Sequence, residues 1–210
     1  MVKIFLFIAL ISASISADGL QNGSFSTEPS VAQSSLAIKS LLLKSPKELD
    51  AKTAIMVGNI YQNGMADLRI HANPEKAKRY YESGAKRGQA MGNLLLANMA
   101  IKEKNIQEYE KQMHRVMKSG DEQLSIPAGL QLAAFYTSFN KNDKAVSVLL
   151  YLANVYDEPS AQFMVGWSIV SGAYTPPGMN IEDGKGYLNT ACSNPKRTEK
   201  ITQKCNQILK

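Results

Sequence analysis

Histidine and cysteine are scarce in this 210-residue chain, and their scarcity excludes several kinds of chemistry. The two histidines, His71 and His114, lie 43 residues apart, and neither has a cysteine or a group of acidic residues near it in the sequence. A zinc site needs three or four such ligands, so we expect no metal site. The sequence also lacks a Ser–His–Asp spacing, a glycine-rich phosphate loop and an HExxH motif. We therefore expect no cofactor and no enzymatic activity.

Long hydrophobic runs are also missing, apart from one at the start of the chain. Residues 4–15 are almost wholly apolar, follow a lysine and precede small residues, but twelve residues are too few to span a bilayer. This pattern predicts a secretory signal peptide over residues 1–17, cleaved after Ala17, with a short uncleaved anchor as the alternative. Residues 18–30, rich in Gly, Ser, Asn and Gln, are expected to form a flexible leader. We expect the remainder, residues 31–210, to form one domain that is not an integral membrane protein.

The two cysteines, Cys192 and Cys205, both lie near the C-terminus. An even number of cysteines in an exported protein favours a disulfide, which here would close a short loop between two helical segments. The alternative is a pair of free, buried thiols.

Positive charge is concentrated in one part of the chain. The formal net charge is +6, and the segment 76–118 holds ten Lys or Arg residues against four Glu residues. A basic face can attract an anionic partner, such as an acidic protein surface, an anionic glycan or a lipid. The other interpretation is the solvated outer face of amphipathic helices. Export argues against a nucleic acid as the partner.

Period-two alternation is absent, which excludes strands, and proline and glycine recur at regular intervals. Proline fits the first turn of a helix and glycine its end, and Asn73, Asn142 and Asn180 suit N-caps. A capping box at Ser45–Glu48 predicts a helix start there. After a possible first helix at 31–44, the pattern predicts helical hairpins that pair 46–63 with 74–87, 89–103 with 105–119, 126–140 with 142–155, and 159–172 with 181–192, followed by a closing helix at 195–209.

Two similar segments, TAIMVGNIYQNG at 53–64 and AQFMVGWSIVSG at 161–172, point to a repeat architecture. Each places Val-Gly in the middle of a predicted helix, where glycine costs about 1 kcal/mol relative to alanine. That cost suggests that another helix comes close at Gly58 and Gly166. Repeat proteins of this kind usually bind other molecules rather than catalyse reactions.

The pattern resembles the Sel1-like repeat, a relative of the tetratricopeptide repeat. The first hairpin carries it best, the fourth fairly well, and the second and third weakly. The resemblance implies an all-α fold, a right-handed superhelix (solenoid) of about four helical hairpins with a C-terminal capping helix. The residues that define the repeat are Val57, Gly58, Tyr61, Gly64, Ala77, Tyr80, Gly88, Val165, Gly166, Gly172, Tyr187 and Ala191.

First helices line the concave face in solenoids of this type, so corresponding positions on them are candidate partner-binding residues: Asn59, Leu96, Ala134 and Trp167. Trp167 is the one tryptophan of the chain, and it could either anchor a peptide or pack against the closing helix. The number of copies in an assembly is not indicated.

The resemblance implies an exported bacterial adaptor that binds a protein or peptide in the cell envelope, in secretion, envelope assembly or the regulation of cell-wall enzymes. A periplasmic location is expected, and the alternative is a secreted factor that acts on a host. An enzyme acting on β-lactams or peptidoglycan is a third hypothesis. It is weaker, because the Sel1-like proteins linked to β-lactams carry a disulfide in every repeat, and here cysteines occur only near the C-terminus.

Overall fold

A computed structural model describes residues 31–208 of the chain. The predicted signal peptide and leader lie outside the described residues and remain predictions. By its internal contacts the chain divides into two units between Ile38 and Lys39, and the described part of the second unit, residues 39–208, is compact. Within the described residues every regular element is helical, the one β-feature being an isolated bridge between Met65 and Ile70. No helix in this range has the length and apolar character needed to cross a membrane.

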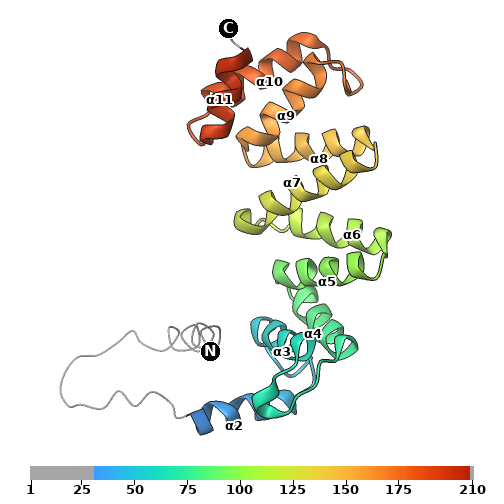
Figure 1. Cartoon of the computed structure of the whole chain (residues 1–210), viewed down its shortest axis with the longest axis vertical. Coiled ribbons are helices and arrows are strands. Elements are labelled where there is room, and N and C mark those ends of the chain that lie inside the picture. Colours follow the sequence, from blue (N-terminus) through green and yellow to red (C-terminus); the bar gives the residue numbers. More distant parts are fainter. Residues whose placement is uncertain (1–30, 209–210) are drawn as a thin grey trace, which may run out of the picture. The chain divides into compact units, whose positions relative to one another are not determined.

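The second unit is a stack of helical hairpins in which each helix packs against the next one along the chain (Figure 1). Helix α2 (Val31–Leu42) begins in the first unit and ends in the second. The helices that follow are α3 (Ala51–Asn63), α4 (Pro74–Lys86), α5 (Ala90–Lys102), α6 (Ile106–Met117), α7 (Glu122–Ser138), α8 (Asn142–Val155), α9 (Pro159–Val170), α10 (Ile181–Ser193) and α11 (Glu199–Ile208), with a short 3₁₀ turn, η1 (Ala66–Leu68). The prediction of an all-α solenoid is confirmed.

Several helix ends follow directly from the local sequence. The Asn73 side chain accepts a hydrogen bond from the backbone N–H of Lys76, and Pro74 occupies the first helical position of α4. Asn180 forms a capping box with Asp183 at the start of α10. The glycines predicted at helix ends, Gly64, Gly88, Gly120 and Gly172, all adopt positive φ, a backbone conformation that side chains with a Cβ disfavour.

Other helix starts differ from the prediction. Ser45 and Glu48 do form a hydrogen bond, at 2.6 Å, but the segment they enclose is a turn. Helix α3 begins later, at Ala51, because the carboxylate of Asp50 caps the backbone N–H groups of Lys52 and Thr53. The N-cap of α8 is Lys141, one residue before the predicted Asn142.

Helix α7 begins at Glu122, earlier than predicted, so Pro127 lies inside the helix instead of at its start. The extra first turn is held by Ser125, which is fully buried and donates its hydroxyl to the carbonyl of Val116 at the end of α6, at 3.0 Å. Packing against the preceding helix thus outweighs the backbone hydrogen bond that the proline removes.

Glycine allows close contact within two of the hairpins. A Cβ placed on Gly58 would lie 2.5 Å from the ring of Tyr81 in α4. A Cβ placed on Gly166 would lie 2.6 Å from the carbonyl oxygen of Gly184 and 2.8 Å from the backbone nitrogen of Leu188 in α10. The second contact is with backbone, which cannot turn aside as a side chain can.

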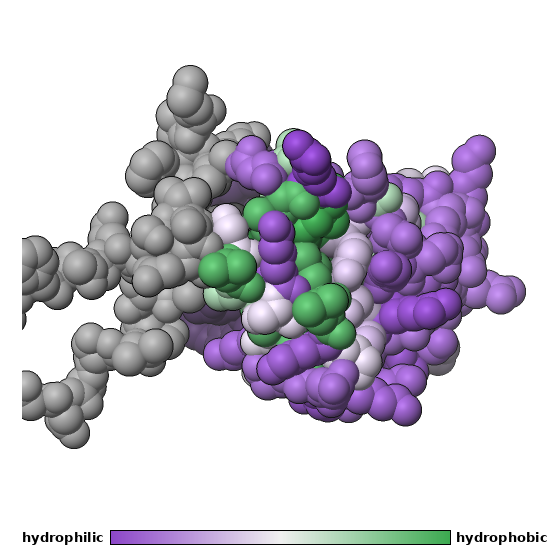
Figure 2. Space-filling model, turned by 90° about the horizontal axis from the view of Figure 1, so that it is seen from below, coloured by the Kyte–Doolittle hydropathy of each residue, from purple (hydrophilic) through white to green (hydrophobic). Residues whose placement is uncertain are grey.

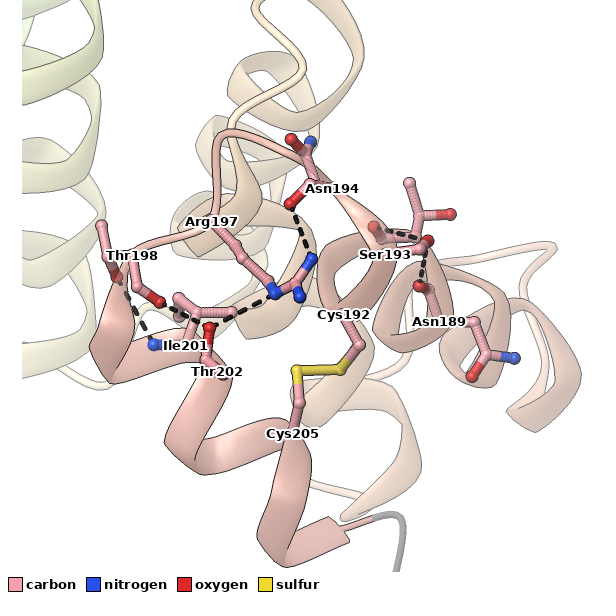
Figure 3. The surroundings of a disulfide bond; sticks show 10 residues. Asn189, Cys192, Ser193, Asn194, Arg197, Thr198, Ile201, Thr202 and Cys205 are labelled. Atoms are coloured by element: carbon pink, nitrogen blue, oxygen red, sulfur yellow. Dashed lines mark hydrogen bonds between the residues drawn. A yellow bond between two sulfur atoms is a disulfide. The ribbon is translucent and has the colours of Figure 1, made fainter.

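The C-terminal end of the stack is closed by α11, which is joined to α10 by a disulfide (Figure 3). Cys192 and Cys205 are bonded, with their Cα atoms 5.7 Å apart, which confirms the predicted pairing. Cys205 and Ile201 of α11 are buried in a cluster with Phe163 and Leu188.

The closing helix α11 begins at Glu199, four residues later than predicted. Asn194 is buried, and its amide donates to the carbonyl of Asp157 and to Oε1 of Gln162, at 3.1 and 3.2 Å. Its oxygen accepts from the backbone N–H of Lys196. These bonds fix the chain as a turn where the sequence had suggested a helix start.

We predict that Gly166→Ala lowers the free energy of unfolding by about 1–3 kcal/mol, because the new methyl group would force α9 and α10 apart. Gly186→Ala is the matched control: Gly186 lies in the same hairpin, and a Cβ there meets nothing within 4 Å. The control is expected to stabilise the protein by roughly 0.4–1 kcal/mol. Urea unfolding of both variants measures the difference, and equal midpoints would contradict the close contact at Gly166.

The disulfide joins residues 13 apart in the sequence, and its loss is expected to lower the free energy of unfolding by about 2–3 kcal/mol. Thermal unfolding of the oxidised protein with and without reductant gives the measurement. The double variant Cys192→Ala/Cys205→Ala serves as the control, because reductant has no bond to break in it. Two titratable thiols in protein isolated under oxidising conditions would show that the disulfide does not form.

Candidate binding surfaces

The four candidate partner-binding residues occupy different environments. Ala134 on α7 and Trp167 on α9 are exposed, Trp167 to 49%. Asn59 on α3 is half-buried, and its side-chain oxygen accepts a hydrogen bond from the hydroxyl of Tyr81 at 2.8 Å. Leu96 on α5 is buried and packs with Ile55 and other core residues. The sequence spacing therefore brings only two of the four to an open surface.

The second hairpin explains the position of Leu96. It lacks the Val-Gly pair that sets the register in the first and fourth hairpins. In α5 Leu96 and Ala97 are both buried, as Val57 and Gly58 are in α3, and the exposed residue is Asn98, not Leu96. In α5 the pattern of buried residues, and not the spacing from the first hairpin, therefore shows which helix face is covered.

Trp167 of α9 is exposed and is not part of the buried cluster that contains α11. Phe163 packs against α11 in its place, with Nζ of Lys204 5.1 Å from the centre of its ring. Trp167 and Met164 are neighbours three residues apart on the same helix, and both are exposed. Together they form an apolar surface on a first helix, defined here as the α9 patch.

A second apolar surface lies at the end of the stack that begins with α3. Figure 2 looks onto this end and shows hydrophobic surface gathered there, with hydrophilic surface around it. This surface contains a hollow of about 530 Å³, which is lined by Leu42, Leu43, Tyr61 and Ile70, with Lys39 and Lys76 beside them. The hydroxyl of Tyr61 donates to the carbonyl of Leu42, and Nζ of Lys76 lies 5.1 Å from the centre of the Tyr61 ring.

A second hollow, of about 600 Å³, lies where the first two hairpins meet, and we call it the α4–α6 groove. Its lining comes from three consecutive helices: Glu82, Ala85 and Lys86 of α4, Asn93 and Leu96 of α5, and Glu108, Lys111, Gln112 and Arg115 of α6. Binding sites for small molecules commonly have volumes of roughly 300–1,000 Å³. The groove lies within the basic segment that the sequence singled out.

Only part of the charge in this groove is neutralised. Lys111 forms an ion pair with Glu108 at 2.9 Å, and the Gln112 amide donates to the same carboxylate at 2.6 Å. These hydrogen bonds, first that from Lys111, hold the pKa of Glu108 below its usual value. Among the described residues, Lys86 and Arg115 have no carboxylate partner within 4.0 Å.

The histidines are not brought together. His71 lies in the loop after η1, and His114 is half-buried on α6 with Nε2 3.3 Å from the hydroxyl of Tyr136. Burial lowers the pKa of His114. Within residues 31–208 no group of His, Cys, Asp and Glu side chains could hold a metal ion.

No protein-family model matches the sequence, and no curated protein gives a significant match. Solved structures do match. A Sel1 repeat protein from Oxalobacter formigenes is similar over 84% of this chain and 68% of its own, with a TM-score of 0.50 and 17% identity. The protective antigen c5321 of uropathogenic Escherichia coli strains, which displays an SLR fold, is similar over 84% of this chain and 36% of its own, with a TM-score of 0.50 and 20% identity. The resemblance to the Sel1-like repeat is therefore confirmed for the fold.

Proposed function

We propose that the protein is a non-catalytic scaffold that binds a protein or peptide through its helical repeats. The observation that carries the proposal is the α9 patch, where the tryptophan of the chain is half exposed beside Met164. Tryptophan is enriched among the residues that contribute most to binding at interfaces, because it buries a large area at small entropic cost. The stacked hairpins supply a rigid surface on which such an anchor can be presented.

We further propose that the protein works outside the cytoplasm, in the bacterial periplasm. The predicted signal peptide supports export, and so does the disulfide between Cys192 and Cys205, since such bonds persist in oxidising compartments. Release of the protein by osmotic shock is the expected result. Recovery from the culture medium alone would favour the secreted, host-directed alternative instead.

A photo-cross-linking amino acid placed at position 167 is expected to give an adduct of defined mass with one partner in intact cells. The reason is that a side chain at the centre of an interface lies within reach of the partner, whereas one outside it does not. Phe139, an exposed aromatic residue at the end of α7, provides the matched control position. Adducts of equal yield at both positions, or at neither, would contradict binding through the α9 patch.

We also expect Trp167→Ala to abolish co-purification of the partner that is cross-linked at this position, while Phe139→Ala leaves it unchanged. Both side chains are substantially exposed, so both variants should keep the thermal stability of the parent protein within about 0.5 kcal/mol. Thermal unfolding checks this condition before the binding comparison is made.

A further inference from the structure

The α4–α6 groove contains a polar side chain that has no partner. Asn93 of α5 is 9% exposed, and among the described residues its side-chain amide forms no hydrogen bond. The Oε1 atom of Gln112, which lines the same groove, is sealed from solvent, whereas the amide atoms of Asn93 are not. Asn93 therefore presents a donor and an acceptor at the groove, in a position where almost all of its surface is already covered.

Because the amide atoms of Asn93 reach solvent, a molecule that enters the groove displaces water from them and must offer hydrogen bonds of its own in return. The side chain of Asn offers one carbonyl oxygen and one NH₂ group. A peptide group offers the complement, an N–H donor beside a C=O acceptor. The chemistry at the base of the groove thus matches the main chain of a bound peptide.

The unpaired cations define the rest of the ligand. Lys86 on α4 and Arg115 on α6 line the same groove from neighbouring hairpins. An arginine guanidinium can bind a carboxylate with two parallel hydrogen bonds, and lysine adds a point charge. Glu82 also lines the groove and weakens its attraction for anions. Glu108 pairs with Lys111 and is also stabilised by the charge of Arg115, although Arg115 forms no ion pair with it.

We propose that the α4–α6 groove binds a peptide segment with an acidic side chain, with Asn93 holding the main chain and Lys86 and Arg115 holding the carboxylate. The inference rests on the proposed function, to which it adds a second contact and the chemical class of the ligand. The site is separate from the α9 patch, so each can be tested without the other.

The test is a selection of random heptapeptides, displayed on phage, against the full-length protein. Asp and Glu are expected to be enriched in the selected peptides. The strongest peptide is then synthesised with a fluorescent label, and its affinity is measured by anisotropy. Arg115→Gln is expected to weaken binding about 10-fold, through loss of the charged hydrogen bonds. Lys200→Gln, an exposed cation of α11 outside the groove, removes the same charge and is expected to leave the affinity unchanged.

Two further variants separate the roles within the groove. Asn93→Ala is expected to weaken binding about 5- to 10-fold with the same dependence on salt, because the lost bonds are between neutral groups. Glu82→Gln is expected to strengthen binding several-fold, since it removes a repulsive charge. Thermal unfolding identifies a variant that fails to fold. If Asn93→Ala fails to fold, the Arg115→Gln variant still tests the proposal, because Arg115 is exposed.

Selected peptides without acidic residues would overturn the inference, as would equal effects of Arg115→Gln and Lys200→Gln. A failed selection together with an intact cross-link at position 167 would overturn the groove as a peptide site and leave the proposed function standing. Failure of both the selection and the cross-link would overturn both.

Discussion

Close backbone contact inside the hairpins is the constraint on which the rest of this structure depends. In the fourth hairpin α10 approaches α9 so closely that even a methyl group on Gly166 would meet its backbone. A stack of hairpins buries its apolar surface only between neighbouring helices, so the distance within each pair fixes how the next pair can pack. The buried residues between α5 and α9 form one continuous cluster, which is possible because each helix contributes to two interfaces.

The fold was predictable because its local chemistry repeats. The Asn-Pro helix start at Asn73 and the glycines at helix ends act within a few residues, and the structure places them accordingly. The mid-helix Val-Gly pairs act on the partner helix, but they are recognisable because the first and fourth hairpins share them. The predicted starts of α3, α7 and α11 were wrong for a different reason. Asp50, Ser125 and Asn194 set those starts, the last two through bonds to other segments that no local pattern reveals.

The candidate sites were less predictable, because they depend on which face of each helix is covered. The degenerate second hairpin lacks the mid-helix Val-Gly pair of the first and fourth hairpins, so spacing alone put Leu96 on a surface when it lies in the core. The same packing leaves Asn93 at the base of a groove that two hairpins build together. Sequence showed that the segment 76–118 is basic, but only the structure shows that Lys86 and Arg115 line one hollow, with no carboxylate within 4.0 Å of either among residues 31–208.

The closure of the C-terminal end of the stack determines which apolar residues of α9 remain exposed. At the C-terminal end, a disulfide secures α11 over Phe163 and Leu188, so the apolar surface there is already used by the protein itself. Trp167 lies one turn beyond Phe163 on the same helix and is left uncovered. Because the cap holds α9 in place on one side and α8 and α10 hold it on the others, Trp167 is exposed on a helix that has little freedom to move. A side chain held in place in this way loses little entropy on binding, which is what the proposed role of Trp167 requires.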